Sequence, residues 1–510
     1  MTISEKKRKR YILLAMTSCT SLIFLNATLF PVALPTIQRE LFVSAAGLQW
    51  IINAYLLATA IFVVAGGKLG DIFGHRKIFC IGVVIYTVAS IMGSMADTGW
   101  WLIMSRAIQG MGAALMSPTG MSLLIHAFPE NERGRAIGIV VAIGALFLSL
   151  GPLIGGIFTQ YLSWRLAFWL NPPIAFFGIL MVIKNVSKSE KQNETFDFIG
   201  FFTLSLALTC LTLALMQGKV WGWGSWQVIF LFLLSFSFFL AVRGLERFAR
   251  HPFFQFNLFR NRIFLGGCFL IVCSQMILII TVFWPLYFQN TLLDSPALAG
   301  AITAIGTIPL MLFAPISGNL ADRHGARFPL IIGFLLLIFS FLWFAYFLSF
   351  NQVPLLFPAL FAFGAGISFV MTPVSASTLS AVPKSKIGAA TGIYNTLRFT
   401  GATIGVAIFG AVQINVESSL FARKLKKEAG TAMLDPDLYE GLLNHFPRAE
   451  KAAQTLEPGA LAYVKQALAQ ASMVAFSAVN LMAAAIAFLA LIITLILFRK
   501  KVKRKEGDSI

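Results

Sequence analysis

The sequence predicts an all-α integral membrane protein. Hydrophobic residues make up 58% of the 510 residues, charged residues only 12%, and the mean hydropathy is +0.80. A helix of about 20 apolar residues spans the roughly 30 Å hydrocarbon core of a bilayer, and runs of about this length recur along the chain. Because the backbone must satisfy its own hydrogen bonds in lipid, each run is expected to be a helix.

Fourteen such runs are expected to cross the membrane. In chain order they are 11–36, 48–70, 77–95, 99–126, 134–161, 164–184, 197–216, 225–245, 263–289, 297–321, 328–348, 353–382, 388–415 and 471–498. An even number of crossings places both chain ends on one side. The basic segments "EKKRKR" and "FRKKVKRK" lie near those ends, so the positive-inside rule predicts cytoplasmic N- and C-termini. The net charge of +19 therefore indicates topology and contact with anionic membrane lipids, not nucleic-acid binding.

A charged motif occurs twice, as "GKLGDIFGHRK" at 67–77 and "GNLADRHGAR" at 318–327. Its shared residues are Gly67, Asp71, Gly74 and Arg76 in the first copy and Gly318, Asp322, Gly325 and Arg327 in the second. Each copy follows the second run of a unit of six. The runs therefore divide as 6 + 2 + 6, and parallel six-helix halves with a binding site between them are a known transporter design.

This division predicts three parts of the chain. Residues 1–190 form a first six-helix bundle, 191–255 supply two inserted helices, and 256–510 form a second six-helix bundle. A long extracytoplasmic loop is expected at about 416–470, either as a spacer or as short helices over the mouth of a cavity.

Further motifs resemble one family of membrane proteins. They are "RAIQG" at 106–110, "GPLIGG" at 151–156 and "YNTLRFTGATIGVAIFG" at 394–410. Together with the repeated loop, they resemble the major facilitator superfamily in its fourteen-helix drug:proton antiporter branch. The resemblance implies the major facilitator fold in a bacterial cytoplasmic membrane. It also implies export of small amphipathic compounds by alternating access, coupled to protons, by a monomer without a cofactor or metal.

The resemblance assigns roles to particular residues. Both loop copies are expected to act as gates, with Asp71 meeting the N-terminus of the thirteenth helix; an ordinary cytosolic turn is the alternative. The exporter motif of the fifth helix comprises Gly151, Pro152, Gly155 and Gly156. The candidates for the cavity and for coupling are Asn26, Tyr55, Arg106, Gln109, Asn395 and Arg398. Arg106 has independent support, because a charge inside an apolar helix is costly and usually faces a cavity or a partner.

One departure from the family concerns proton coupling. The usual acid of the first helix falls at Asn26, which cannot titrate, and no acidic residue lies in the middle of a predicted helix. A cavity with Arg106 and no acid favours neutral or anionic substrates. An uncoupled facilitator, or a transporter of an anionic metabolite or lipid, is therefore the alternative function. The sequence shows no convergent nucleophile, base or metal set, so we expect no enzyme.

Overall fold

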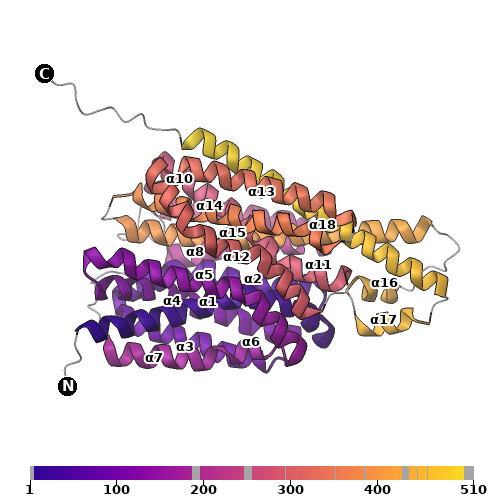
Figure 1. Ribbon diagram of the computed structural model, residues 1–510, viewed down its shortest axis with the longest axis horizontal. Coiled ribbons are helices and arrows are strands. Elements are labelled where there is room, and N and C mark those ends of the chain that lie inside the picture. The colour runs from indigo at the N-terminus through magenta and orange to yellow at the C-terminus, as the bar shows by residue number, and fades with distance from the viewer. Residues whose placement is uncertain are drawn as a thin grey trace.

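The protein is a bundle of long helices that run nearly parallel to one axis (Figure 1). The computed structural model describes residues 5–186, 196–245, 255–292, 295–350, 352–383, 386–427, 436–444, 446–455 and 458–498. Within these residues there is no β-strand. α1 begins and α18 ends at one end of the bundle, here called the terminal end; α16 and α17 lie at the opposite end, here called the loop end (Figure 1).

The helices follow the predicted order. The first group is α1 (Glu5–Leu41), α2 (Ala45–Phe73), α3 (His75–Ser94), α4 (Gly99–Ala127), α5 (Glu130–Tyr161), α6 (Leu166–Trp169) and α7 (Asn171–Asn185). Next come α8 (Phe198–Trp221) and α9 (Trp226–Leu245). The last group is η1 (Phe256–Arg260), α10 (Arg262–Leu278), η2 (Ile279–Val282), α11 (Phe283–Thr291), α12 (Pro296–His324), α13 (Arg327–Phe347), η3 (Leu348–Phe350), η4 (Val353–Leu356), α14 (Phe357–Ser380), α15 (Ile387–Lys427), α16 (Pro436–Leu443), α17 (Pro447–Ala453) and α18 (Pro458–Leu497).

Thirteen helical segments of the described chain are long and apolar enough to cross a membrane. The remaining predicted crossing is α4, which has 29 residues and is therefore about 44 Å long at about 1.5 Å per residue. α4 is long enough to span, but polar side chains such as Arg106 and Gln109 interrupt its apolar sequence. An all-helical membrane fold with the predicted succession of spans is thereby confirmed.

Local sequence signals set several helix starts. The Ser44 hydroxyl accepts a hydrogen bond from the amide of Gly47 at the start of α2, and Asp197 accepts one from Gly200 at the start of α8. Ser295 caps α12 in the same way. Such side-chain acceptors satisfy amide groups that have no partner within the helix, so they fix where each helix begins.

The packing of the first helices is repeated by the last ones. α2 and α3 both pack on α4, as α12 and α13 both pack on α14; α1 packs on α5, as α10 packs on α15. The two groups meet through reciprocal pairs, α5 with α12 and α2 with α15. This pattern agrees with the sequence repeat, because equivalent helices occupy equivalent places. The residue bounds of the three predicted parts remain a prediction.

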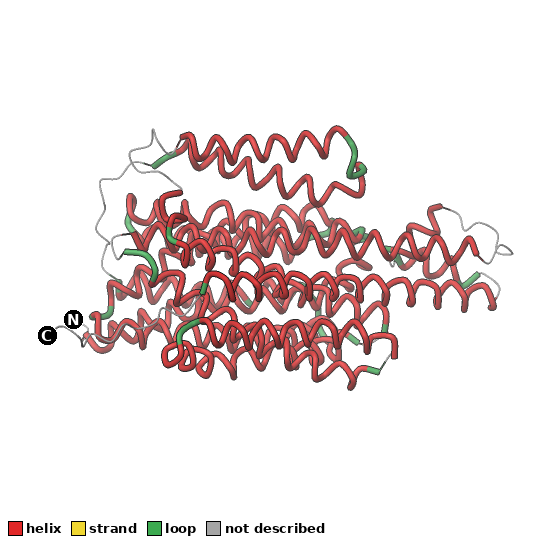
Figure 2. Tube along the Cα trace, turned by 90° about the horizontal axis from the view of Figure 1, so that it is seen from above, coloured by secondary structure: helices red, strands yellow, loops and turns green. Residues whose placement is uncertain are grey.

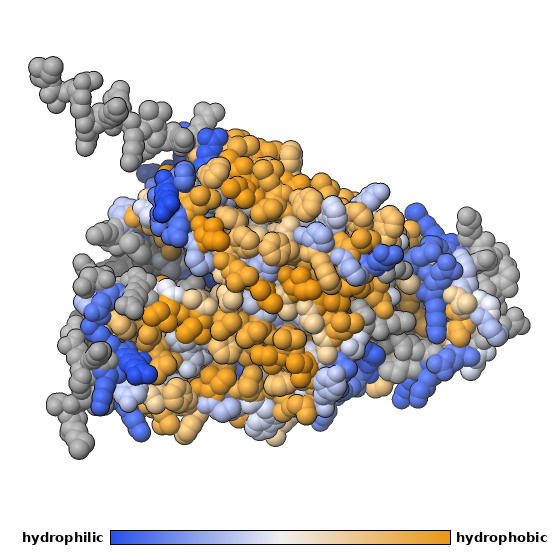
Figure 3. Space-filling model, viewed as in Figure 1, coloured by the Kyte–Doolittle hydropathy of each residue, from blue (hydrophilic) through white to orange (hydrophobic). Residues whose placement is uncertain are grey.

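α8 and α9 form an antiparallel pair along one side of the bundle (Figure 2). α8 contacts α2 and α15, one helix from each group. The surface of the bundle is a broad apolar belt, with hydrophilic residues gathered at both ends (Figure 3). This distribution is expected of a protein whose sides face lipid and whose ends face water.

The long loop predicted at about 416–470 is shorter in the structure. α15 continues to Lys427 and α18 begins at Pro458, so helix replaces both ends of the predicted loop. The extensions pack with α16 and α17 around a small apolar core of their own that includes Phe421, Leu442 and Val464. The helices extend past the predicted bounds because this core stabilises the additional turns.

Candidate functional site

A chain of buried hydrogen bonds links four of the first helices. Arg106 Nη1 donates to Gln109 Oε1 at 2.5 Å, and Gln109 Nε2 donates to Ser90 Oγ at 2.7 Å. Asn171 Nδ2 also donates to Ser90 Oγ, at 2.8 Å. Asn26 Nδ2 donates to Asn171 Oδ1 at 2.7 Å. The network thus joins α1, α3, α4 and α7, and all five side chains are buried.

The Arg106 guanidinium also lies between two aromatic rings. Its central carbon is 4.3 Å from the ring centroid of Tyr55 and 4.8 Å from that of Phe30. Its Nε donates to the carbonyl of Ile51 at 3.4 Å. Among the groups that the structure pairs with Arg106 there is no carboxylate. Amide, carbonyl and ring contacts therefore stabilise the charge.

The network gives Asn26, a candidate for the cavity, partners within its own group of helices. Its amide has two partners inside the first group of helices, Asn171 Oδ1 and the Leu22 carbonyl oxygen at 2.9 Å. Asn26 is only 2% exposed. The sequence could not show this, because the partner lies 145 residues away in α7.

A second, partly buried arginine, Arg398, belongs to α15 in the other group of helices. Tyr55 interacts electrostatically with both Arg106 and Arg398. Two buried polar atoms here, Tyr55 Oη and Arg398 Nε, have no hydrogen-bond partner among the described residues. Asn395, on the preceding turn of α15, is partly buried. A polar centre between the two groups of helices therefore retains unused hydrogen-bonding capacity.

The glycines of the α5 motif allow two close helix contacts. A Cβ atom at Gly151 would collide with Thr28 Oγ1, and one at Gly155 would collide with the Leu29 carbonyl oxygen. Both partners belong to α1. Backbones that approach this closely in a membrane require small residues at the contact.

The same motif joins α5 to α12 of the other group. A Cβ at Gly156 would lie 2.5 Å from the carbonyl oxygen of Pro296, and a Cβ at Gly300 would collide with the Pro152 carbonyl oxygen. Further along the same two helices, Ser149 Oγ donates to the Thr307 carbonyl oxygen at 2.9 Å. This contact holds the two groups together at the loop end.

α12 is packed unevenly along its length. With the exception of Ser317, all its buried residues lie between Ala299 and Pro309, toward the loop end. Another contact between the groups near this end is the hydrogen bond from Gln289 Nε2 to the Val32 carbonyl oxygen, at 2.9 Å. In this conformation the two groups of helices are joined most closely at the loop end.

The repeated loops share a backbone turn and differ in their charge contacts. Gly74 has φ +96° and Gly325 has φ +78°, values that favour glycine. Asp71 Oδ1 lies 3.2 Å from His75 Nε2, whereas Asp322 is exposed. Asp71 thus contacts the next turn of its own loop, and it also interacts electrostatically with Lys68.

The other shared positions of the two copies make similar contacts. Arg76 Nη2 donates to the Ile183 carbonyl oxygen at 2.9 Å, and Arg327 Nη2 donates to that of Leu495 at 3.5 Å. A Cβ at Gly67 would lie 3.7 Å from Pro118, and one at Gly318 would lie 3.7 Å from Thr372. Those are ordinary van der Waals distances, so the first glycine of each copy is not required by close packing.

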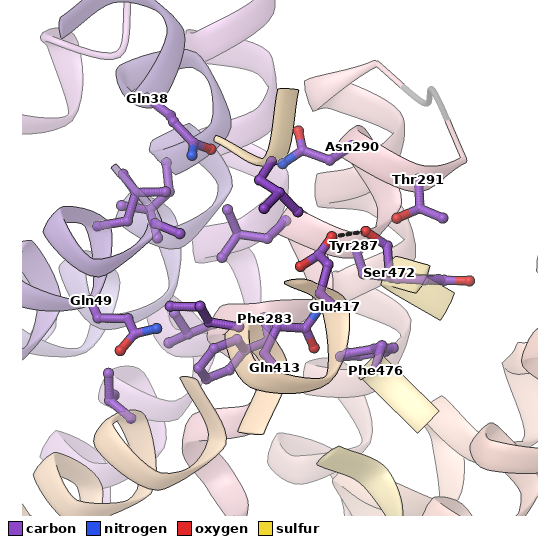
Figure 4. Close-up of a pocket in the computed structure, with 18 of the residues that line it drawn as sticks. Gln38, Gln49, Phe283, Tyr287, Asn290, Thr291, Gln413, Glu417, Ser472 and Phe476 are labelled. Carbon is purple, nitrogen blue, oxygen red and sulfur yellow. Dashed lines mark hydrogen bonds between the residues drawn. The ribbon is translucent and has the colours of Figure 1, made fainter. Parts of the chain in front are cut away.

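A pocket opens between the groups at the loop end (Figure 4). α1 and α2 line one side, and α11, α15 and α18 line the other. Its polar residues are Gln38, Gln49, Tyr287, Asn290, Thr291, Gln413, Glu417 and Ser472.

The sequence missed Glu417 because it fell in the predicted loop. The signal that could have located it is the apolar spacing of Ile414, Phe421 and Leu425, which continues the helix. Among the described residues no group of three or more His, Cys, Asp or Glu side chains is arranged to hold a metal ion.

Comparison with known proteins agrees with this architecture. The chain is 31% identical over 409 residues to the multidrug resistance protein Stp of Mycobacterium tuberculosis strain H37Rv, covering 77% of this chain and 73% of Stp. It is 30% identical over 423 residues to the riboflavin transporter RibZ of Clostridioides difficile, covering 82% and 90%.

One solved structure shares the fold along nearly the whole chain. It is a bacterial homologue of the human lysosomal transporter Spinster in an inward-facing, unoccupied conformation, with a TM-score of 0.63 at 18% identity, covering 96% of this chain and 98% of the homologue. The sequence profile of the Major Facilitator Superfamily matches residues 16–406. The chain therefore belongs to the Major Facilitator Superfamily.

Proposed function

We propose that this protein is a proton-coupled secondary exporter of small amphipathic compounds that works by alternating access. Its family and its apolar helices make it a multi-pass transporter of the cell membrane, and relatives at about 30% identity are named for multidrug resistance. The finer statement rests chiefly on one observation: Arg106 and Arg398, from the two groups of helices, both interact electrostatically with Tyr55.

The central polar atoms indicate what kind of group binds there. Tyr55 Oη and Arg398 Nε are buried without a partner, and each such group costs about 1–3 kcal/mol. A substrate acceptor atom between them would recover that energy. Two guanidinium groups without a nearby carboxylate repel a cation, so neutral or anionic groups are favoured at this position.

The packing supports alternating access. The α5–α12 contact joins the two groups on one side of the loop end, where backbones meet without intervening side chains. With the termini in the cytoplasm, as the charge distribution predicts, the α5–α12 side of the bundle is closed to the outside. Opening would require α5 and α12 to separate at Gly156 and Gly300.

A facilitator or a transporter of an anionic metabolite remains the second candidate. This candidate is favoured by Asn26, because its side-chain amide donates two hydrogen bonds and cannot take up or release a proton. A relative named as a riboflavin transporter is consistent with a substrate other than a cationic drug.

Flux through proteoliposomes distinguishes the two candidates. Riboflavin and an anionic dye are loaded, and their release is followed with and without an imposed pH gradient. Acceleration by the gradient supports the coupled exporter, whereas equal release under both conditions supports the facilitator. Arg398→Gln should slow release, and Arg243→Gln, at an exposed arginine of α9, is the control. If wild-type protein released the compounds no faster than loaded liposomes without protein, both candidates would be contradicted.

A further inference from the structure

The pocket at the loop end contains one charged side chain, Glu417. Every other residue that lines it is an amide, a hydroxyl, an aromatic or an aliphatic residue, and no basic residue of the described chain lines it. Sequence reasoning assigned this protein no acid in a cavity between the two groups of helices. The structure supplies one on the extended part of α15 (Figure 4).

The carboxylate of Glu417 is held in place by its neighbours. The Ser472 hydroxyl on α18 donates a hydrogen bond to it (Figure 4). On the adjoining turn, Tyr439 of α16 donates to the Ser418 carbonyl oxygen at 2.8 Å. Burial, and after it the neighbouring Glu417 charge, raise the pKa of Tyr439. Ser472 thus holds the carboxylate directly, and α16 supports the adjoining turn of α15.

The position of Glu417 along α15 lowers the free-energy cost of ionising its carboxyl group. It lies thirty residues after the start of the helix, a rise of about 45 Å at about 1.5 Å per residue. The hydrocarbon core is only about 30 Å thick. Glu417 therefore lies near the lipid–water interface, where a charge costs much less than at the centre of the membrane.

Two other polar atoms beside the pocket are buried without a hydrogen-bond partner among the described residues. They are Gln413 Oε1, one turn before Glu417, and Tyr287 Oη of α11. The Gln413 oxygen can only accept. A ligand that carries N–H groups would satisfy it and the Glu417 carboxylate together.

Aromatic rings form the adjoining wall. Tyr287 stacks on Phe476, with centroids 4.6 Å apart and an angle of 12° between the planes, and Phe283 lies on the same side of the pocket. Aromatic faces next to a carboxylate are the combination that recognises organic cations, because the ring face attracts positive charge and the apolar body packs on the ring.

We propose that this pocket binds a small protonated amine with Glu417 as its counter-ion. The ammonium donates N–H to Glu417 and Gln413, and its apolar part lies against Tyr287 and Phe476. The central position near Arg106 and Arg398 repels such a ligand, so cations and neutral or anionic compounds occupy different places. The site concerns binding at the loop end and does not depend on the proposed transport activity.

The test compares two probes of nearly equal size on the full-length protein in nanodiscs at pH 7. Phenethylamine is a cation there, and 2-phenylethanol is neutral. Calorimetric titration of wild-type protein should give tighter binding of phenethylamine. Glu417→Gln should weaken phenethylamine binding about tenfold or more and leave 2-phenylethanol unchanged. Asp97→Asn, which removes an exposed acid elsewhere, is the matched control.

A second variant keeps the test decisive if Glu417→Gln protein is unstable. Ser472→Ala keeps the charge and loses only its anchor, so phenethylamine binding should weaken a few-fold. Equal affinity of wild type for the two probes, or of wild type and Glu417→Gln for phenethylamine, would overturn the site. Failure of riboflavin flux in proteoliposomes would instead contradict the proposed transport function, and the two results are independent.

Discussion

The two groups of helices share one packing scheme and differ in what fills it. α1–α7 enclose a hydrogen-bonded chain from Arg106 to Asn26. In the second group the interior is aromatic. The ring centroid of Trp284 lies 4.8 Å from that of Phe363 and 5.7 Å from that of Phe344. Helix packing therefore constrains shape, while the chemistry of the interior can diverge between repeats.

The two arginines show the same contrast. Arg106 is bonded on several sides within its own group. Arg398 lies where the groups meet and retains an unpartnered Nε. A satisfied charge contributes to the stability of its surroundings, and an unsatisfied one is available to a ligand. Four pairs of substitutions test this difference.

The largest effect on stability is expected at Arg106. Arg106→Leu leaves the Gln109 acceptor unpaired and removes the contacts with two rings, so the free energy of unfolding should fall by about 3 kcal/mol. Arg398→Leu should change it by less than about 1 kcal/mol while abolishing riboflavin flux. Denaturation by SDS in mixed micelles measures both variants. Equal losses would contradict the division between a structural and a ligand-binding arginine.

Asn26→Asp should be the next most costly change. The aspartate has no N–H to donate to Asn171 Oδ1 and the Leu22 carbonyl oxygen, and the loss should be about 2–3 kcal/mol. The matched control is Asn480→Asp in α18, where the amide makes one such bond, to the Phe476 carbonyl oxygen at 2.8 Å. A gain of proton-dependent cation transport in the first variant would instead show that position 26 faces the cavity.

Two serines compare the networks more finely. Ser90→Ala removes an acceptor shared by Gln109 and Asn171 and should cost about 1–3 kcal/mol. Ser340→Ala in α13 removes one donor to the Ala359 carbonyl oxygen and should cost about 1 kcal/mol. Thermal unfolding in one detergent ranks the two. The reverse order would mean that the network in the first group is not cooperative.

The smallest effect on stability is expected in the repeated loops. Asp71→Asn and Asp322→Asn should each change the free energy of unfolding by less than about 0.5 kcal/mol, because both side chains reach solvent. Transport should nevertheless fall more for Asp71→Asn, which loses the contact with His75. Initial rates of riboflavin release, at matched protein content, provide the comparison. Unchanged transport in both variants would count against a gating role.

Much of the fold followed from local sequence. The apolar runs gave the succession of spans because a bilayer of fixed thickness selects helices of a fixed length. The repeated motif predicted related halves, and its Gly74 and Gly325 both lie at turns with positive φ. Prediction failed at the C-terminal end of α15 and the N-terminal end of α18, where a separate apolar core stabilises additional helical turns.

The sequence by itself determined the membrane class, the order of helices, the two repeated turns and the presence of Arg106 in an apolar helix. Only the tertiary structure decided which side chains meet. Asn26 bonds to Asn171, Tyr55 interacts electrostatically with both Arg106 and Arg398, and Glu417 lines a pocket. Hydropathy depends on each residue and its near neighbours, whereas these contacts depend on how helices far apart in the chain rotate and pack against one another.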